Sequence, residues 1–224
     1  MSGAVIIGVG PGIGQAVARR FAREGLPIAV IARGEATVRE AVDSLAFSGV
    51  PVEGLVADAT DEDALRDALD AAADRLGPPD VVVYNAALVR ADRLRELTAK
   101  TLLDTWAVNV AGAFTAAMHV LPAMAERGAG TFVITGGMPE PERRYASLSL
   151  GKTGVRTLLA LLDQEYGRSG VHVATVTVGG VVGPGTAFDP DEIAEHYWRL
   201  HTQPRDRWER EVLYSGREPA ASEE

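Results

Sequence analysis

A lysine inside a predicted helix is the side chain best suited to proton chemistry in this chain. Lys152 follows the segment Tyr145-Ala-Ser-Leu-Ser-Leu-Gly, and residues four apart lie on one face of a helix. A tyrosine four residues before the ammonium would have its phenol pKa lowered toward neutral pH, which suits a general acid. Leu148 occupies that position and cannot transfer a proton. The segment therefore has the frame of a catalytic pair without its proton donor.

Four other side chains are candidates for that proton. Tyr145 precedes Lys152 by seven residues, about 10 Å along a helix axis, unless it lies before the helix begins. Ser149 is closer but is a poor acid, and His196 and Tyr197 lie in a later helix that could close over a substrate. For each, a structural role is the commoner explanation: loop packing, a helix-surface hydroxyl, a solvated side chain and a core contact, respectively.

A glycine-rich run connects the first predicted strand to the first predicted helix. Glycines let the backbone turn tightly and approach a pyrophosphate, while the helix N-terminus offers free N–H groups and a positive dipole end. A tight turn without a ligand is the alternative, but the strand–turn–helix context makes the motif specific. The residues expected to bind the dinucleotide here are Gly8, Gly10, Gly12, Ile13 and Gly14.

The end of the second predicted strand bears on which dinucleotide is bound. Ala32-Arg33 stands where an acidic residue would bond the ribose hydroxyls of NAD, and arginine can pair with a 2′-phosphate. The sequence therefore favours NADP, although the nearby Glu35 leaves NAD open and Arg33 could simply be solvated. Asp58, after the third strand, could face the adenine amino group or cap the following turn.

Composition excludes several classes of function. The chain has 224 residues, a net charge of −9 and no cysteine, which excludes disulfides and thiolate metal sites. The absence of a basic stripe argues against nucleic acid and anionic membranes. The four histidines have no zinc-ligand spacing, and no apolar run of membrane-spanning length is expected. We expect a cytoplasmic protein with a small-molecule substrate and no metal.

Buried strands alternate with helices along the chain, which predicts a parallel sheet covered on both faces. The expected fold is α/β, a Rossmann-type doubly wound sheet in three α/β/α layers. One domain is expected over residues 1–215, with a lid segment at 184–208 and a disordered tail at 216–224. Among the expected elements are helices at 37–47, at 61–76 (capped by Thr60) and at 100–126, and strands at 171–178 and 208–214.

Taken together, these motifs resemble the short-chain dehydrogenase/reductase family over about residues 3–200. Gly8-xxx-Gly12-x-Gly14 resembles its glycine motif, and Asn85-Ala86-Ala87 resembles its Asn-Asn-Ala-Gly motif, which supports the sheet and the adenosine pocket. Gly179-Gly180 stand at a common Pro-Gly pair, so Gly180 and Val182 would pass the nicotinamide carboxamide.

The resemblance also implies roles for the polar residues of the site. Asn109 matches the asparagine that holds a proton-relay water, and Thr135 matches the serine that orients the substrate carbonyl. Lys152 matches the lysine that binds the nicotinamide ribose, whereas the tyrosine position holds Leu148 and leaves Tyr145 as a candidate donor.

The resemblance implies an NADP(H)-dependent oxidoreductase acting on an unknown carbonyl or alcohol, with a non-standard proton donor. The alternative is a catalytically impaired sensor or scaffold that binds a dinucleotide, which Leu148 favours. Non-redox chemistry is a third possibility that nothing in the sequence selects. A homodimer or homotetramer through the two long helices, 100–126 and 147–167, is also implied.

Overall fold

The computed structural model describes residues 3–217, and the expected tail beyond residue 217 lies outside the described residues. A seven-stranded sheet has the order β3-β2-β1-β4-β5-β6-β7, and every neighbouring pair is parallel. The predicted doubly wound sheet is therefore confirmed. The strands are β1 (Ala4–Ile7), β2 (Ile28–Ala32), β3 (Val52–Val56), β4 (Val81–Tyr84), β5 (Gly130–Thr135), β6 (Val171–Val178) and β7 (Glu211–Tyr214).

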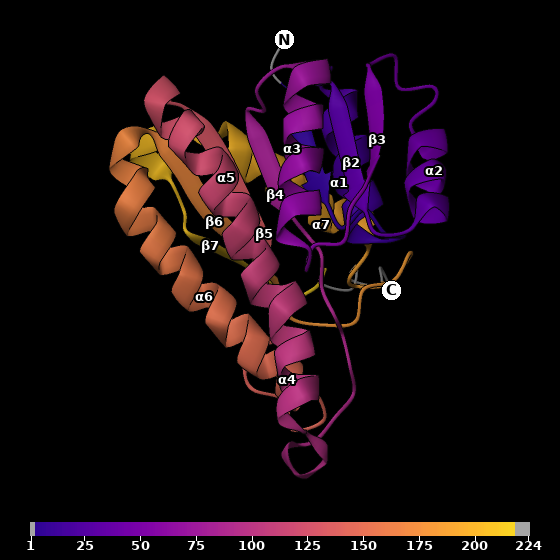
Figure 1. Ribbon diagram of the computed structural model, residues 1–224, viewed down its shortest axis with the longest axis vertical. Helices are drawn as coiled ribbons and strands as arrows, with labels where there is room; N and C mark the ends of the chain where they lie inside the picture. The colour runs from indigo at the N-terminus through magenta and orange to yellow at the C-terminus, as the bar shows by residue number, and fades with distance from the viewer. Residues whose placement is uncertain (1–2, 218–224) are drawn as a thin grey trace, which may run out of the picture.

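Helices cover both faces of this sheet, as the run of buried residues in most strands requires (Figure 1). One face packs on α1 (Ile13–Arg23), α2 (Glu35–Ser44) and α7 (Pro190–Thr202). The other packs on α3 (Glu62–Leu76), α5 (Gly112–Arg127) and α6 (Ala146–Tyr166). α4 (Ala99–Trp106) precedes α5 and lies beside α6 beyond the end of the sheet.

Three expected boundaries differ from the structure. Asp61, not Thr60, caps α3, because the Asp61 carboxylate accepts the Ala64 N–H at 3.1 Å while the Thr60 hydroxyl donates to Asp58. The helix expected at Thr37 begins at Glu35. β7 is shorter than expected, because Trp208 stacks on His172 with ring centroids 4.6 Å apart instead of joining the strand.

The long helix is continuous from Ala99 to Arg127 and includes a π-helical turn at Ala107–Ala111. By its length and composition this helix could cross a membrane, which was not expected from the sequence. An 18-residue window of the helix has a mean hydropathy of 1.4. However, 56% of that window is buried inside the fold. The apolar side chains are thus largely explained by packing on the sheet and on α6, and they are weak evidence for a membrane span.

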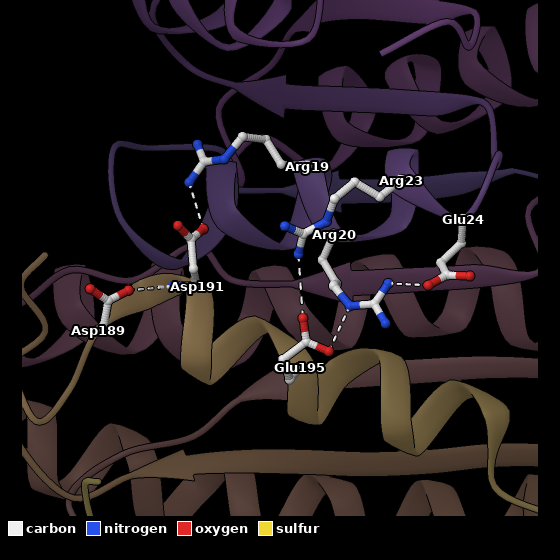
Figure 2. Close-up of polar contacts among 7 residues, drawn as sticks. All are labelled: Arg19, Arg20, Arg23, Glu24, Asp189, Asp191 and Glu195. Carbon is white, nitrogen blue, oxygen red and sulfur yellow. Dashed lines mark hydrogen bonds and ion pairs between the residues drawn. The ribbon is translucent and has the colours of Figure 1, made fainter. Parts of the chain in front are cut away.

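α7 lies in the segment expected to form a lid, but it is packed into the fold. Ile193, Tyr197 and Leu200 are fully buried on the α1 side of the sheet. Ion pairs join the exposed edges of α7 and α1: Arg19 to Asp191 at 2.8 Å, and Arg20 to Glu195 at 2.7 Å (Figure 2). Closure of α7 over a substrate would break these contacts.

Arg20 is the most buried cation of this ion-pair group. Its side chain is 11% exposed, and its guanidinium lies 5.1 Å from the Trp198 ring centroid while also bonding Glu24 and Glu195. The Arg20 stem therefore contributes packing as well as charge.

We predict that Arg20→Ala lowers the free energy of unfolding by about 1–2 kcal/mol, because packing and both ion pairs are lost. Arg19→Ala is the matched control, since Arg19 makes one exposed pair with Asp191, and it should cost less than about 0.5 kcal/mol. Urea unfolding of both variants measures the difference. Equal costs would contradict a special role for Arg20.

Candidate functional site

A cavity of about 360 Å³ lies at the carboxyl end of β1 and β4. The strand order reverses at this point. The chain runs outward from β1 through β2 to β3, and it then returns to place β4 on the other side of β1. Open α/β sheets bind ligands at such a switch point. Six residues predicted for nucleotide binding line this cavity together: Gly8, Gly10, Arg33, Asp58, Asn85 and Ala86.

The glycine turn meets the demands of a phosphate site. Gly8 has a φ of 87°, and a Cβ there would lie 2.3 Å from the Ala86 nitrogen. A Cβ on Gly14 would lie 2.6 Å from the Gly8 oxygen, so the helix can approach the strand only with glycine at this position. Gly10 and Gly12 have open space where a side chain would be.

The N-terminus of α1 is available to an anion. Gly12 caps the helix without a side-chain hydrogen bond, and the first turn, beginning at the half-buried Ile13, carries no acidic residue. The Gln15 N–H bonds the Gly10 oxygen at 3.3 Å, which leaves the N–H groups of Ile13 and Gly14 and the positive dipole end of the helix for an anion. This turn fits a pyrophosphate group.

Arg33 and Asp58 line the cavity at the ends of β2 and β3. Arg33 is exposed, and the Thr37 hydroxyl-bearing side chain lines the same cavity from the start of α2. The Asp58 carboxylate accepts from the Thr60 N–H at 2.9 Å and from the Thr60 hydroxyl at 2.8 Å. These bonds, with Arg33 adding attraction, hold the Asp58 pKa below its usual value. Asp58 therefore caps the turn while it faces the cavity.

A buried chain of hydrogen bonds runs from the glycine turn to α7. The Asn85 amide donates to the Gly8 oxygen at 2.8 Å, and its own oxygen accepts from the Thr135 hydroxyl at 2.8 Å. The Thr135 hydroxyl has one proton, so the Tyr197 hydroxyl, 2.7 Å away, must donate to Thr135. Burial of Tyr197 raises the pKa of its phenol, which keeps it protonated as a donor.

Lys152 is joined to this chain of hydrogen bonds through the backbone of Thr135. Its ammonium donates to the Thr135 main-chain oxygen at 2.6 Å. Burial and the nearby Arg156 guanidinium lower the Lys152 pKa to about 8. The Thr135 hydroxyl points to the α7 side of the sheet, whereas Lys152 lies on α6 across the sheet, so only the Thr135 carbonyl meets Lys152.

Asn109 lies in the π-helical turn and is 1% exposed. Its side-chain oxygen accepts from the Leu88 N–H at 3.1 Å, and its amide donates to the Leu88 oxygen at 3.2 Å. Both ends of the amide are thus used to hold the loop after β4. A π turn also disturbs the regular helical hydrogen bonds, a feature frequent at functional sites.

Two of the four candidate proton donors, Tyr145 and Ser149, lie at the start of α6 beside Leu148. Leu148 is 3% exposed and belongs to neither main core cluster. Tyr145 is half-buried and immediately precedes α6, as the sequence left open, and its hydroxyl has no hydrogen-bond partner among the described residues. Ser149 is committed elsewhere, because its hydroxyl accepts the Glu142 N–H at 3.0 Å. His196 and Tyr197 lie on the packed helix α7.

Gly180 and Val182 lie in the loop after β6 and do not line the nucleotide cavity. A Cβ on Gly180 would lie 2.2 Å from the Phe188 ring, and Val182 packs against the α1–α7 core.

Sequence reasoning missed two residues that matter to the site. Thr37 could have been found from its place in the first turn of the helix that follows Arg33. Asp92 has no comparable signal: its buried carboxylate accepts from the Ser147 N–H at 2.9 Å and the Ser147 hydroxyl at 2.5 Å. Asp92 thereby caps α6, the helix that carries Lys152, across 55 residues of sequence.

The amino-acid sequence is similar to known proteins over most of its length. Residues 2–192 match the family model described as short chain dehydrogenase. A protein of Streptomyces coelicolor described as a putative ketoacyl reductase is 34% identical over 208 residues, covering 89% of this chain and 78% of that protein. A granaticin polyketide synthase putative ketoacyl reductase of Streptomyces violaceoruber is 30% identical over 87% of this chain and 71% of its own length.

The fold is also similar to those of solved structures. A variant of actinorhodin polyketide ketoreductase with NADPH has a TM-score of 0.89 and 27% identity, with 96% of each chain covered. An alcohol dehydrogenase from the archaeon Thermococcus sibiricus, complexed with 5-hydroxy-NADP, has a TM-score of 0.86 and 26% identity over 98% of this chain and all of that chain.

The forced direction of the buried hydrogen-bond chain predicts unequal effects of two substitutions. Thr135→Val should lower the free energy of unfolding by about 1–3 kcal/mol, since the Asn85 oxygen and the Tyr197 hydroxyl both lose their partner. Tyr197→Phe should cost less, about 0.5–1.5 kcal/mol, because the Thr135–Asn85 bond remains. Urea unfolding of the single and double variants measures the coupling between the two positions.

The matched control is Tyr214→Phe, which removes a tyrosine hydroxyl bonded to the Ala187 oxygen at 3.1 Å, away from this chain of hydrogen bonds. Its effect should add to that of Thr135→Val. Additive costs for Thr135→Val and Tyr197→Phe as well would contradict the chain of hydrogen bonds.

Proposed function

The chain belongs to the short-chain dehydrogenase family, whose members are oxidoreductases, and we propose that it uses NADP(H) to interconvert an unknown carbonyl compound and its alcohol. The observation that carries this proposal is the cavity where the glycine turn, Asn85 and Arg33 meet at the switch point of the sheet. Relatives described as ketoacyl reductases and structures described with NADP(H) support it. None of these comparisons supports the sensor or scaffold alternative.

NADP is preferred to NAD because of the side chains at the end of β2. Ala32 leaves no carboxylate to repel a 2′-phosphate, and Arg33 offers a guanidinium that can bind it. Thr37 adds a hydroxyl at the N-terminal end of α2. When bound, the nicotinamide supplies or accepts the hydride.

Lys152 is proposed to hold the nicotinamide ribose hydroxyls, with its ammonium positioned by the Thr135 carbonyl. The Thr135 hydroxyl is bonded to Asn85 and Tyr197, so we assign Thr135 to positioning Lys152 rather than to polarising the substrate. The Asn109 amide is likewise occupied by Leu88. A relay water at Asn109 would therefore use the main chain of the π turn.

Leu148 is proposed to stand at the position of the family's catalytic tyrosine, four residues before Lys152. Proton delivery then falls to another group. Tyr145 is the candidate that we retain, because it precedes the helix and its hydroxyl is not bonded elsewhere in the described chain. Ser149 and Tyr197 are committed to structural hydrogen bonds.

We propose a single domain over residues 1–215, a cytoplasmic location and a homodimer or homotetramer formed through the long helices. Exposed apolar side chains on α4, α5 and α6 support the association, with Leu103 at 64%, Phe114 at 50% and Leu161 at 58% exposure.

Arg33→Gln should weaken NADPH binding by about 10-fold to 100-fold, since a charge-assisted bond to the 2′-phosphate contributes about 1.5–3 kcal/mol. NADH binding should hardly change, because NADH lacks that phosphate. Fluorescence titration of both nucleotides measures the affinities, and Arg39→Gln, a solvated arginine on α2, is the control. An equal loss for NADPH and NADH would count against the assignment of Arg33.

Leu148→Tyr should raise the rate of NADPH-dependent carbonyl reduction by about 10²-fold, because it places a phenol four residues before Lys152. Leu148→Phe is the control of similar size without a hydroxyl. Oxidation of NADPH is followed with a panel of β-keto esters and simple ketones. If both variants have the same rate, the missing proton donor is not the only defect of the site.

A further inference from the structure

The backbone at the end of β5 presents several carbonyl oxygens to α6. The Thr135 oxygen accepts from the Lys152 ammonium at 2.6 Å. Slightly further along the chain, the oxygens of Gly137 and Met138 accept from the Arg156 guanidinium at 3.2 and 3.1 Å. Lys152 and Arg156 are four residues apart on α6 and therefore lie on one face of the helix. Two cations one helical turn apart thus hold one short stretch of backbone.

Met138 has a backbone conformation that needs support from its surroundings. Its φ is 49°, and among residues 3–217 it is the only non-glycine residue with a positive φ. Such a conformation persists where the surrounding contacts impose it. The Arg156 guanidinium bonds the Met138 oxygen and the oxygen of the preceding Gly137 at once. A planar group with five N–H donors suits two neighbouring carbonyls, so Arg156 holds the Gly137–Met138 segment in place.

The Gly137–Met138 segment lies against Lys152. A Cβ on Gly137 would be 3.7 Å from the Lys152 Cε, so the backbone at Gly137 covers the stem of the lysine. Lys152 is only 6% exposed. The loop that begins with this segment ends at Tyr145, the retained candidate for the proton donor. A displacement of the segment would therefore uncover Lys152 and move the loop that leads to Tyr145.

Arg156 also acts on Lys152 through its charge. Neither cation forms an ion pair with a residue in the described part of the chain, and Arg156 is the charged side chain there that affects Lys152. Burial, and then the charge of Arg156, lower the Lys152 pKa to about 8. The ammonium consequently loses its proton as the pH rises through about 8, whereas the guanidinium stays charged.

We propose that Arg156 is a positioning residue of the site, which holds the Gly137–Met138 segment over Lys152 and thereby keeps the lysine shielded from water and bonded to the Thr135 carbonyl. The inference rests on the proposed role of Lys152 in holding the nicotinamide ribose. Arg156 uses its donors on oxygens of the chain itself, so it acts through Lys152 and the loop.

The test observes Lys152 directly, in the full chain without cofactor. The chain has two lysines, Lys100 and Lys152, so labelling with ¹³C at the lysine Cε gives two NMR signals. The pH titration of one signal gives the Lys152 pKa, while the signal of the exposed Lys100 is an internal reference. The ε-methyl signal of Met138 reports the position of the segment, and that of the fully buried Met124 reports an intact core.

Arg156→Gln should raise the pH at which Lys152 titrates by about 0.5–1 pH unit, because a like charge is removed and water reaches the amine. It should also shift the Met138 methyl signal. Arg156→Lys keeps the charge and a donor group, so both changes should be smaller. The matched control is Arg127→Gln, which removes the same charge and a guanidinium bond to the Pro79 oxygen at 2.8 Å. It should change neither signal.

Three results would overturn the proposal. The first is a Lys152 titration that is the same in Arg156→Gln and in the unchanged chain. The second is a titration that moves while the Met138 methyl signal stays in place, because Arg156 would then act by charge alone. The third is an effect of Arg127→Gln as large as that of Arg156→Gln.

A separate titration with NADPH connects the segment to the proposed function. Arg156→Gln should weaken NADPH binding about threefold to tenfold at pH 7, because the lysine that holds the ribose is less well positioned. An unchanged affinity would contradict the positioning role. An unchanged chain that binds no NADPH would contradict the proposed function, whereas the NMR titration, made without cofactor, would still decide the role of Arg156.

Discussion

The site depends most on the two hydrogen bonds of one half-buried amide. Asn85 donates to the Gly8 carbonyl, around which the glycine turn folds, and accepts from Thr135 at the end of β5. The same Thr135 presents its main-chain oxygen to Lys152. Buried polar groups are costly when unpaired, so each of these residues restricts the others. The nucleotide cavity and the lysine are thereby positioned by a single connected network.

α7 extends that network to the far side of the sheet. Tyr197 donates to Thr135 from a helix whose exposed edge is held to α1 by arginine–carboxylate pairs. An element in the region expected to be a lid is thus part of the scaffold. Gly180 and Val182, in the segment between β6 and α7, do not line the nucleotide cavity.

The two faces of α6 differ in burial. Leu148 and Lys152 are buried toward the sheet, whereas Leu150 and Thr153 are exposed on the outward face. The Asp92 carboxylate fixes the start of this helix, and the backbone contacts of Asp92 hold the adjoining loop. One cap consequently fixes the start of the helix that carries Lys152.

The parallel sheet, the glycine turn and β6 at 171–178 could all be predicted from the sequence, because they follow from local periodicity and from backbone positions that need glycine. The role of Thr135 could not be predicted in this way. Side chains alternate along β5, so Thr135 faces α7 with Val133, while Ile134 faces the other layer. The Asp92–Ser147 cap joins residues 55 apart, and such a contact depends on how two loops meet in space, which neighbouring residues do not encode.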